Sequence, residues 1–309
     1  MPTVLQDFSN VSSLSDSQLT EEEALQLANE LSLKLSDGEK PGSDAESLKK
    51  MVAGLGDARG ALRLTFAKSL GAVGDEALPI LCEALRQHQN VVVRRASAKT
   101  LNLIGSKEAL PYLLEAFLED SDPVVLGSSA GAMATIGPDA MDSLLGILKN
   151  PDCTPFQVGL INLALSFIGA KAPEALLEAA ESDVTEVRVA AISALGDQIQ
   201  KSDDHRAKNR VFRALDDCSP DVRAEAVTLI GKSCDAEDVE HMLTRKLIDK
   251  DTQVRKNTAM ALMKLEAFNS VESIEKAKST EDDESVQAVF DVAINLSLIH
   301  ISEPTRRPK

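Results

Sequence analysis

Apolar side chains recur along most of the chain at the three- and four-residue spacing of one helix face. The pattern itself repeats, and its best-preserved copies read NVVVRRASAKTLNLIG (90–105), TEVRVAAISALG (185–196), PDVRAEAVTLIG (220–231) and TQVRKNTAMALMKL (252–265). Aligning the copies gives one anchor position per repeat, 30 to 35 residues apart: Leu62, Val93, Val125, Gln157, Val187, Val222, Val254 and Val286. A fixed period of this length is the signature of a stacked array of helical repeats.

Each repeat is predicted to be a first helix, a turn containing glycine, and a second helix. In the second repeat the first helix runs from about Val92 to Ile104 and Gly105 turns the chain, since glycine fits the left-handed position past a helix end. Short polar side chains able to accept unpaired N–H groups precede most first helices: Asn90, Asp122, Asp152, Asp183, Asp221, Asp251 and Asp283. We therefore expect an all-α protein, an α-α superhelix (solenoid) of about eight short repeats.

The same pattern divides the chain into segments. Residues 1–16 are Ser-rich without apolar periodicity, so we expect them to be disordered, and residues 17–56 are expected to form acidic helices. The repeats occupy 57–296, with a longer loop or an offset between stacked units expected at 197–207. The periodicity then stops, and residues 297–309 (SLIHISEPTRRPK) are expected to be a non-native tail.

Two capping boxes are expected to open the acidic helices. In the first, Thr20 is the N-cap and Glu23 bonds back to its N–H group; in the second, Ser43 and Glu46 take these roles.

Charge and composition narrow the range of partners. The formal net charge is −16, and such a surface repels phosphate backbones, which bind through Lys and Arg. Nucleic acid is therefore not an expected partner. Four scattered cysteines, no secretory signal and no apolar run long enough for a bilayer predict a reduced, soluble, cytoplasmic protein without membrane insertion.

The short period, the V-R-x-x-A-x-x-A-L-G pattern and the capped acidic helix resemble the HEAT-like repeats of the phycobilisome-lyase family. The segments MVAGLGDARGALRLTFAKSLGAVG (51–74) and NVVVRRASAKTLNLIG are especially similar to its cyanobacterial members, and the resemblance covers residues 20–296. It implies a protein that binds phycobiliprotein subunits or their bilins, as a bilin lyase component or as a phycobilisome chaperone or degradation factor. It also implies a protein partner, either a phycobiliprotein subunit or a second lyase subunit, and no resident cofactor beyond a transient bilin.

Metal chemistry of a related kind is not expected. Deoxyhypusine hydroxylases share the short repeat but bind a di-iron centre through His-Glu dipeptides. This chain has no His-Glu dipeptide, and its histidines are the scattered His88, His205, His241 and His300, the last of them in the predicted tail.

An arginine follows the anchor in five repeats, and we name this set the arginine ladder: Arg63, Arg94, Arg188, Arg223 and Arg255. One interpretation is a row of cations for bilin propionates or an acidic partner, because arginine binds a carboxylate through two parallel hydrogen bonds. The repetition favours a structural role, in which each arginine bonds an Asp or a backbone carbonyl of its own or a neighbouring repeat.

Four other residues are candidates for binding. Arg95 breaks the pattern and is expected to face outward. Tyr112 lies on a second helix, where it could stack on a ligand, although a half-buried amphipathic aromatic is the more common case. Cys153 and Cys218 fall in loops between repeats, near helix starts, and could hold a bilin transiently, whereas ordinary free thiols are favoured by the neighbouring aspartates.

The leading hypothesis is therefore a module that holds a phycobiliprotein subunit or bilin, with any rate enhancement coming from positioning. Whether the chain is catalytic stays open. The alternative is a non-catalytic scaffold that docks another protein, such as a cofactor or iron–sulfur assembly factor.

Overall fold

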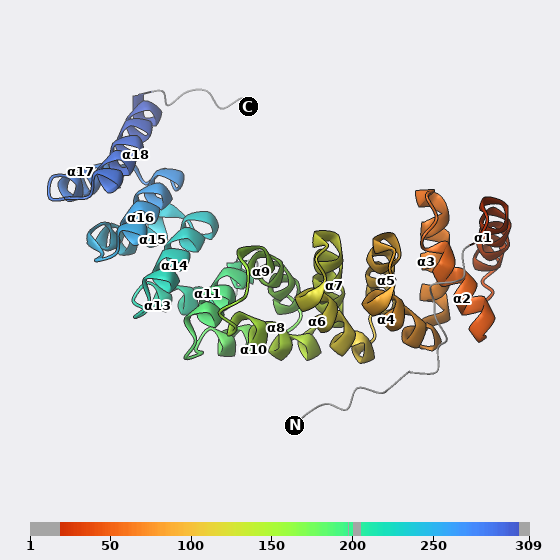
Figure 1. Ribbon diagram of the computed structural model, residues 1–309. Helices are drawn as coiled ribbons and strands as arrows, with labels where there is room; N and C mark the ends of the chain where they lie inside the picture. Colours follow the sequence, from red (N-terminus) through yellow and green to blue (C-terminus); the bar gives the residue numbers. More distant parts are fainter. Residues whose placement is uncertain (1–18, 197, 200–204, 303–309) are drawn as a thin grey trace. The chain divides into compact units, whose positions relative to one another are not determined.

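The computed structural model of the chain describes residues 19–196, 198–199 and 205–302, and all its regular elements are helical (Figure 1). The predicted all-α solenoid fold is confirmed. By its internal contacts the chain divides into two compact halves: the N-terminal half ends at Lys171 and the C-terminal half begins at Ala172. The predicted disordered segment 1–16 lies outside the described residues.

In the N-terminal half, the first helices of the repeats form one layer and the second helices form another (Figure 1). The acidic helices α1 (Glu21–Ser36) and α2 (Ala45–Gly54) come before the repeats. The first helices are α3 (Gly60–Val73), α5 (Val91–Ile104), α7 (Pro123–Ile136) and α9 (Pro155–Gly169). The second helices are α4 (Leu78–Gln87), α6 (Leu110–Glu119) and α8 (Met141–Leu148), each preceded by a short 3-10 turn: η2 (Gly74–Ala77), η3 (Lys107–Ala109) and η4 (Pro138–Ala140).

The C-terminal half repeats this arrangement. Its first helices are α11 (Thr185–Ala194), α14 (Pro220–Ser233), α16 (Thr252–Lys264) and α18 (Glu284–Ser302). Its second helices are α10 (Pro173–Ala179), α13 (His205–Ala214), α15 (Ala236–Thr244) and α17 (Val271–Lys278), with 3-10 turns η5 (Arg245–Ile248) and η6 (Phe268–Ser270). Each second helix packs on the first helix that follows it in the chain.

The anchors mark the buried face of the first helices. Seven of the eight are buried and expose at most 9% of their surface, and Leu62 is half-buried. The residue eight positions after each anchor lies on the same face at helical spacing, and in the N-terminal half these residues expose at most 1%: Leu70, Leu101, Met133 and Leu165. Within each half, the core is therefore a layer between helices rather than a single centre.

Glycines end the first helices where the sequence predicted turns. Gly105 and Gly137 follow α5 and α7 with φ angles of 68° and 86°. Residues with a Cβ rarely adopt this left-handed region, so glycine permits the tight connection to the second helix.

Of the two predicted capping boxes, the first is confirmed and the second is wrong. Glu23 N–H donates to Thr20 Oγ1 at 3.2 Å, and Thr20 N–H donates to Glu23 Oε2 at 2.8 Å. Helix α2 instead takes Asp44 as N-cap, whose carboxylate accepts the Ser47 N–H at 3.0 Å. A carboxylate also interacts favourably with the positive end of the helix dipole.

Four of the seven predicted helix-start residues accept N–H groups of the following helix: Asn90, Asp122, Asp251 and Asp283. The prediction is wrong for Asp152, Asp183 and Asp221, since the N-caps there are Thr154, Val184 and Ser219. Proline explains two of these shifts, because Pro155 and Pro220 occupy the first helical position and thereby define where α9 and α14 begin.

The predicted tail boundary at residue 297 lies inside α18, which continues to Ser302. Helix α13 begins at His205, inside the segment for which a longer loop or an offset between stacked units was predicted. Among the described residues, no helix is both long and apolar enough to cross a membrane.

Candidate functional site

The arginine ladder joins neighbouring repeats through ion pairs. Four of its members donate from Nε and Nη2 to both oxygens of one carboxylate, at 2.6–3.2 Å. We call each such pair a rung. The rungs are Arg94 with Asp120, Arg188 with Asp217, Arg223 with Asp249, and Arg255 with Glu281. Two parallel charge-assisted hydrogen bonds fix orientation as well as charge.

Each rung also organises the backbone of the loops. Arg223 Nη1 donates to the carbonyls of Asp217 and Cys218 in the loop before its own helix, and Arg255 does the same with Asp249 and Lys250. The loop acid is therefore shared, because its carbonyl binds the arginine of its own repeat and its carboxylate binds the preceding one.

The acid of a rung is held in its ionised form. For Asp120, burial alone would raise the pKa, but the hydrogen bonds from Arg94 and from the Asp122 N–H keep it below its usual value. For Glu281 the hydrogen bond from Arg255 is the largest influence and lowers the pKa. These charges serve the packing of repeats, and the paired oxygens are engaged by the protein itself.

Arg63 differs from the other ladder members. Its Nη1 donates to the carbonyls of Asp57 and Ala58, as the other arginines do in their loops. Its Nε and Nη2 groups make no hydrogen bond or ion pair with any described residue.

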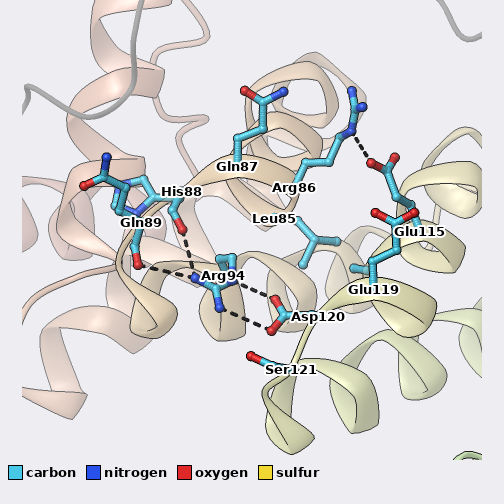
Figure 2. A pocket seen from close by; sticks show the side chains of 11 residues that line it. Leu85, Arg86, Gln87, His88, Gln89, Arg94, Glu115, Glu119, Asp120 and Ser121 are labelled. Carbon is cyan, nitrogen blue, oxygen red and sulfur yellow. Dashed lines mark hydrogen bonds and ion pairs between the residues drawn. The ribbon is translucent and has the colours of Figure 1, made fainter.

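A cavity of about 360 Å³ lies between the C-terminal ends of α4 and α6 (Figure 2). Arg86 of α4 donates from Nε to Glu115 Oε1 of α6 at 2.6 Å across it, and the Arg94–Asp120 rung forms part of its wall. Its lining also includes Gln87, His88, Gln89 and Glu119. Guanidinium donors, amides and carboxylates thus face one space, which suits a ligand that carries both acidic groups and N–H donors.

Two candidate residues from the sequence lie near this cavity. Arg95, with 39% of its side chain exposed, pairs with Asp122 through its Nε at 2.9 Å and its Nη2. This hydrogen bond is the main reason that the pKa of Asp122 falls to about 2. Tyr112 is buried with 8% of its surface exposed, so the expectation of a half-buried ring is wrong and little of the ring is open to a ligand.

The cysteines differ in exposure. Burial raises the pKa of Cys82 to about 12, and it also raises the pKa of the half-buried Cys153, just before the N-cap of α9. Cys218 is exposed, and its thiol donates to Asp217 Oδ1 at 3.5 Å while Arg188 Nη2 lies at 3.6 Å from its sulfur. Transient bilin attachment at Cys153 or Cys218 stays a prediction, as does ligand binding by Arg95 and Tyr112.

Sequence reasoning missed the cavity because its two sides come from different repeats. Arg86 and Glu115 are 29 residues apart and belong to no motif. One signal was available: His88 lies six residues before Arg94, where Asp217 and Asp249 precede Arg223 and Arg255. Across the described residues, no three His, Cys, Asp or Glu side chains are arranged to hold a metal ion.

Comparison with known proteins identifies this helical array. The family model of HEAT repeats matches residues 48–134 and 209–294, so the chain belongs to the HEAT-repeat proteins. Within this class it is similar to the bilin biosynthesis protein MpeU of Synechococcus sp. (strain WH8020). The two are 58% identical over 282 residues, which cover 91% of this chain and 95% of that protein. The resemblance to phycobilisome-lyase-type repeats is thereby confirmed.

A solved structure shares the fold. A chain of the Kap95:Nup1 complex superposes on 93% of this chain and 45% of its own length, with 16% identity and a TM-score of 0.50. A chain of the complex of CpcE and CpcF of phycocyanin lyase from Nostoc sp. PCC7120 covers 60% of this chain and 99% of its own, with 22% identity and a TM-score of 0.30. At these identities, neither likeness bears on function.

Proposed function

We propose that this protein binds bilins, or the phycobiliprotein subunits that carry them, and acts in bilin biosynthesis or attachment. The observation that carries the proposal is the 58% identity to a bilin biosynthesis protein over nearly the full length of both chains.

The chemistry of the cavity between α4 and α6 supports a bilin as ligand. An open-chain tetrapyrrole carries propionate carboxylates, which accept hydrogen bonds from guanidinium groups. It also carries pyrrole N–H groups, which donate hydrogen bonds to carboxylates. Arg86 supplies a group of the first kind, and Glu115 and Glu119 supply groups of the second kind. The cavity is at the lower end of ligand-site volumes, so it fits part of a tetrapyrrole and leaves the remainder for a protein partner to cover.

The repeat architecture supports a role in positioning. Helical arrays present extended surfaces, and a protein that holds an apo-subunit and a bilin together gains rate from proximity and orientation without acid–base groups of its own. In this proposal the bilin is a transient ligand, and a phycobiliprotein subunit or a second lyase subunit is the partner.

The test is co-expression of the full chain with a phycobiliprotein subunit and a bilin source. We expect the subunit to co-purify with the chain, and its visible absorbance, retained after denaturation, to increase over that of cells lacking the chain. Loss of both effects, also with a second lyase subunit present, would refute the proposal and leave the scaffold interpretation.

A further inference from the structure

The arginine ladder contains one rung without an acid. In the four complete rungs, the carboxylate lies six residues before the ladder position of the next repeat: Asp120 before Leu126, Asp217 before Arg223, Asp249 before Arg255 and Glu281 before Gln287. For Arg63 the next ladder position is Arg94, and the residue six before it is His88.

The backbone at His88 matches that of the acids. His88 Nδ1 accepts the N–H of Asn90, two residues on, at 3.1 Å, as Asp249 Oδ1 accepts the N–H of Asp251 at 3.0 Å. The His88 carbonyl accepts from Arg94 Nη1 at 3.0 Å, as the Asp249 carbonyl accepts from Arg255 (Figure 2). The loop therefore makes the same two hydrogen bonds, and an imidazole replaces the carboxylate of its first residue.

This replacement leaves donors without an acceptor. Arg63 Nε and Nη2, the groups that bind the carboxylate in every other rung, bond no described residue. Because His88 Nδ1 accepts a hydrogen bond, the proton of the neutral imidazole is on Nε2, which is also a donor. Burial is the main cause that lowers the pKa of His88, which keeps the ring neutral near pH 7. The ladder position of Arg63 is therefore matched by an imidazole at the sequence position where the complete rungs have a carboxylate.

The histidine of this open rung belongs to the lining of the candidate site, whereas Arg63 does not. His88 and Gln89 line the cavity between α4 and α6, whose volume is about 360 Å³ (Figure 2). The charge of Arg63 contributes to lowering the pKa of Asp57, but the Asp57 carboxylate is hydrogen-bonded by Arg59, and the Arg63 guanidinium attracts a further anionic group.

We propose that Arg63 and His88 form an open rung that binds the carboxylate of a bilin propionate, while the rest of the bilin extends into the cavity beside His88. This assignment rests on the proposed function for the nature of the ligand. That the bound group is a carboxylate follows from the complete rungs, in which a carboxylate binds Nε and Nη2 of the arginine.

The experiment compares biliverdin, which has two free propionates, with its dimethyl ester, which has none. Each is titrated into the full chain and followed by visible absorbance. The variants are His88→Asp, which supplies the missing acid, and Arg63→Gln, which removes the guanidinium. Lys68→Gln is the matched control, because it removes an exposed cation from the same helix α3.

We expect His88→Asp and Arg63→Gln each to raise the Kd for biliverdin about tenfold or more, the size of one charge-assisted contact, and Lys68→Gln to leave it unchanged. The dimethyl ester should bind the wild type about tenfold more weakly than biliverdin, and no variant should weaken it further. His88→Asp should also raise the Tm, because it closes the rung, so affinity and stability move in opposite directions.

Equal binding of acid and ester, or biliverdin affinity unaffected by His88→Asp, would overturn the inference. The inference would also be overturned if the wild type bound no biliverdin. The same holds if Arg63 were needed only for co-purification of a protein subunit. The proposed function is judged separately by that co-purification and by bilin attachment, so each can fail without the other.

Discussion

At the scale of single residues, the arginine ladder shows how one side chain stabilises two repeats. Arg255 binds the loop carbonyl of Asp249 on its own side and the carboxylate of Glu281 on the other, at 2.6 and 2.7 Å. Both charged groups are largely buried, with 13% and 6% of their side chains exposed. Removing one partner leaves the other as an unpaired buried charge, which lowers the free energy of unfolding.

The Glu281 carboxyl should therefore make stability depend on acid pH. Its pKa in the folded chain is lowered by Arg255 and by the Asp283 N–H, although burial opposes this. The pKa of an unfolded glutamate is about 4.3. Because the folded-state pKa lies below it, the ionised carboxylate contributes its full stabilisation above about pH 4.3, and this contribution is lost as the pH falls through the folded-state pKa. Urea unfolding of wild type and Glu281→Gln should show a difference at pH 7 that shrinks below about pH 4.

The acids of the other rungs are present in both the wild type and Glu281→Gln, so their titration cancels when the two proteins are compared. A difference that stayed constant from pH 7 to pH 3 would show that Glu281 is not held ionised by Arg255.

At the scale of helices, glycine sets how closely neighbouring first helices approach. A Cβ on Gly231 of α14 would lie 2.6 Å from Ala261 Cβ and 3.0 Å from Ala261 Cα of α16. Since the obstacle includes backbone, the helices would have to move apart. We expect Gly231→Ala to lower the free energy of unfolding by about 1–3 kcal/mol, the usual cost of overpacking.

Gly131 of α7 is the matched control, because a Cβ there meets no atom within 4 Å. Gly131→Ala should stabilise the helix by roughly 0.5–1 kcal/mol through lower backbone entropy in the unfolded chain. Thermal or urea unfolding measures both, and equal effects of the two substitutions would contradict the close contact between α14 and α16.

Element positions were predictable because the buried face of each first helix follows the helical period, as Val93, Leu101 and their equivalents show. Helix starts were less predictable: Asp152 and Asp221 looked like caps, but the neighbouring prolines decide the first turn. The cavity was not predictable from local pattern, because Arg86 and Glu115 meet only when two repeats stack. His88 carried a signal, which becomes visible once its loop is compared with those of Asp217 and Asp249.

At the scale of the whole molecule, stability in a repeat array is close to a sum of repeats and nearest-neighbour interfaces. Damage should then stay local. The Arg223–Asp249 rung joins α14 to the loop before α16, with 13% and 8% of the two side chains exposed. Helices α5 and α6 belong to the N-terminal half, whereas this rung lies in the C-terminal half.

We expect Arg223→Ala to lower the free energy of unfolding by roughly 1–3 kcal/mol, because it leaves the Asp249 carboxylate buried without its cation. Amide hydrogen exchange should become faster in α14 and α16 and remain unchanged in α5 and α6. Lys264→Gln, which removes an exposed cation at the end of α16, should change neither. Faster exchange in α5 and α6 to the same extent would instead mean that the array opens as one cooperative body. In that case, ligand binding at the Arg63 and His88 rung would be coupled to the rungs of the C-terminal half.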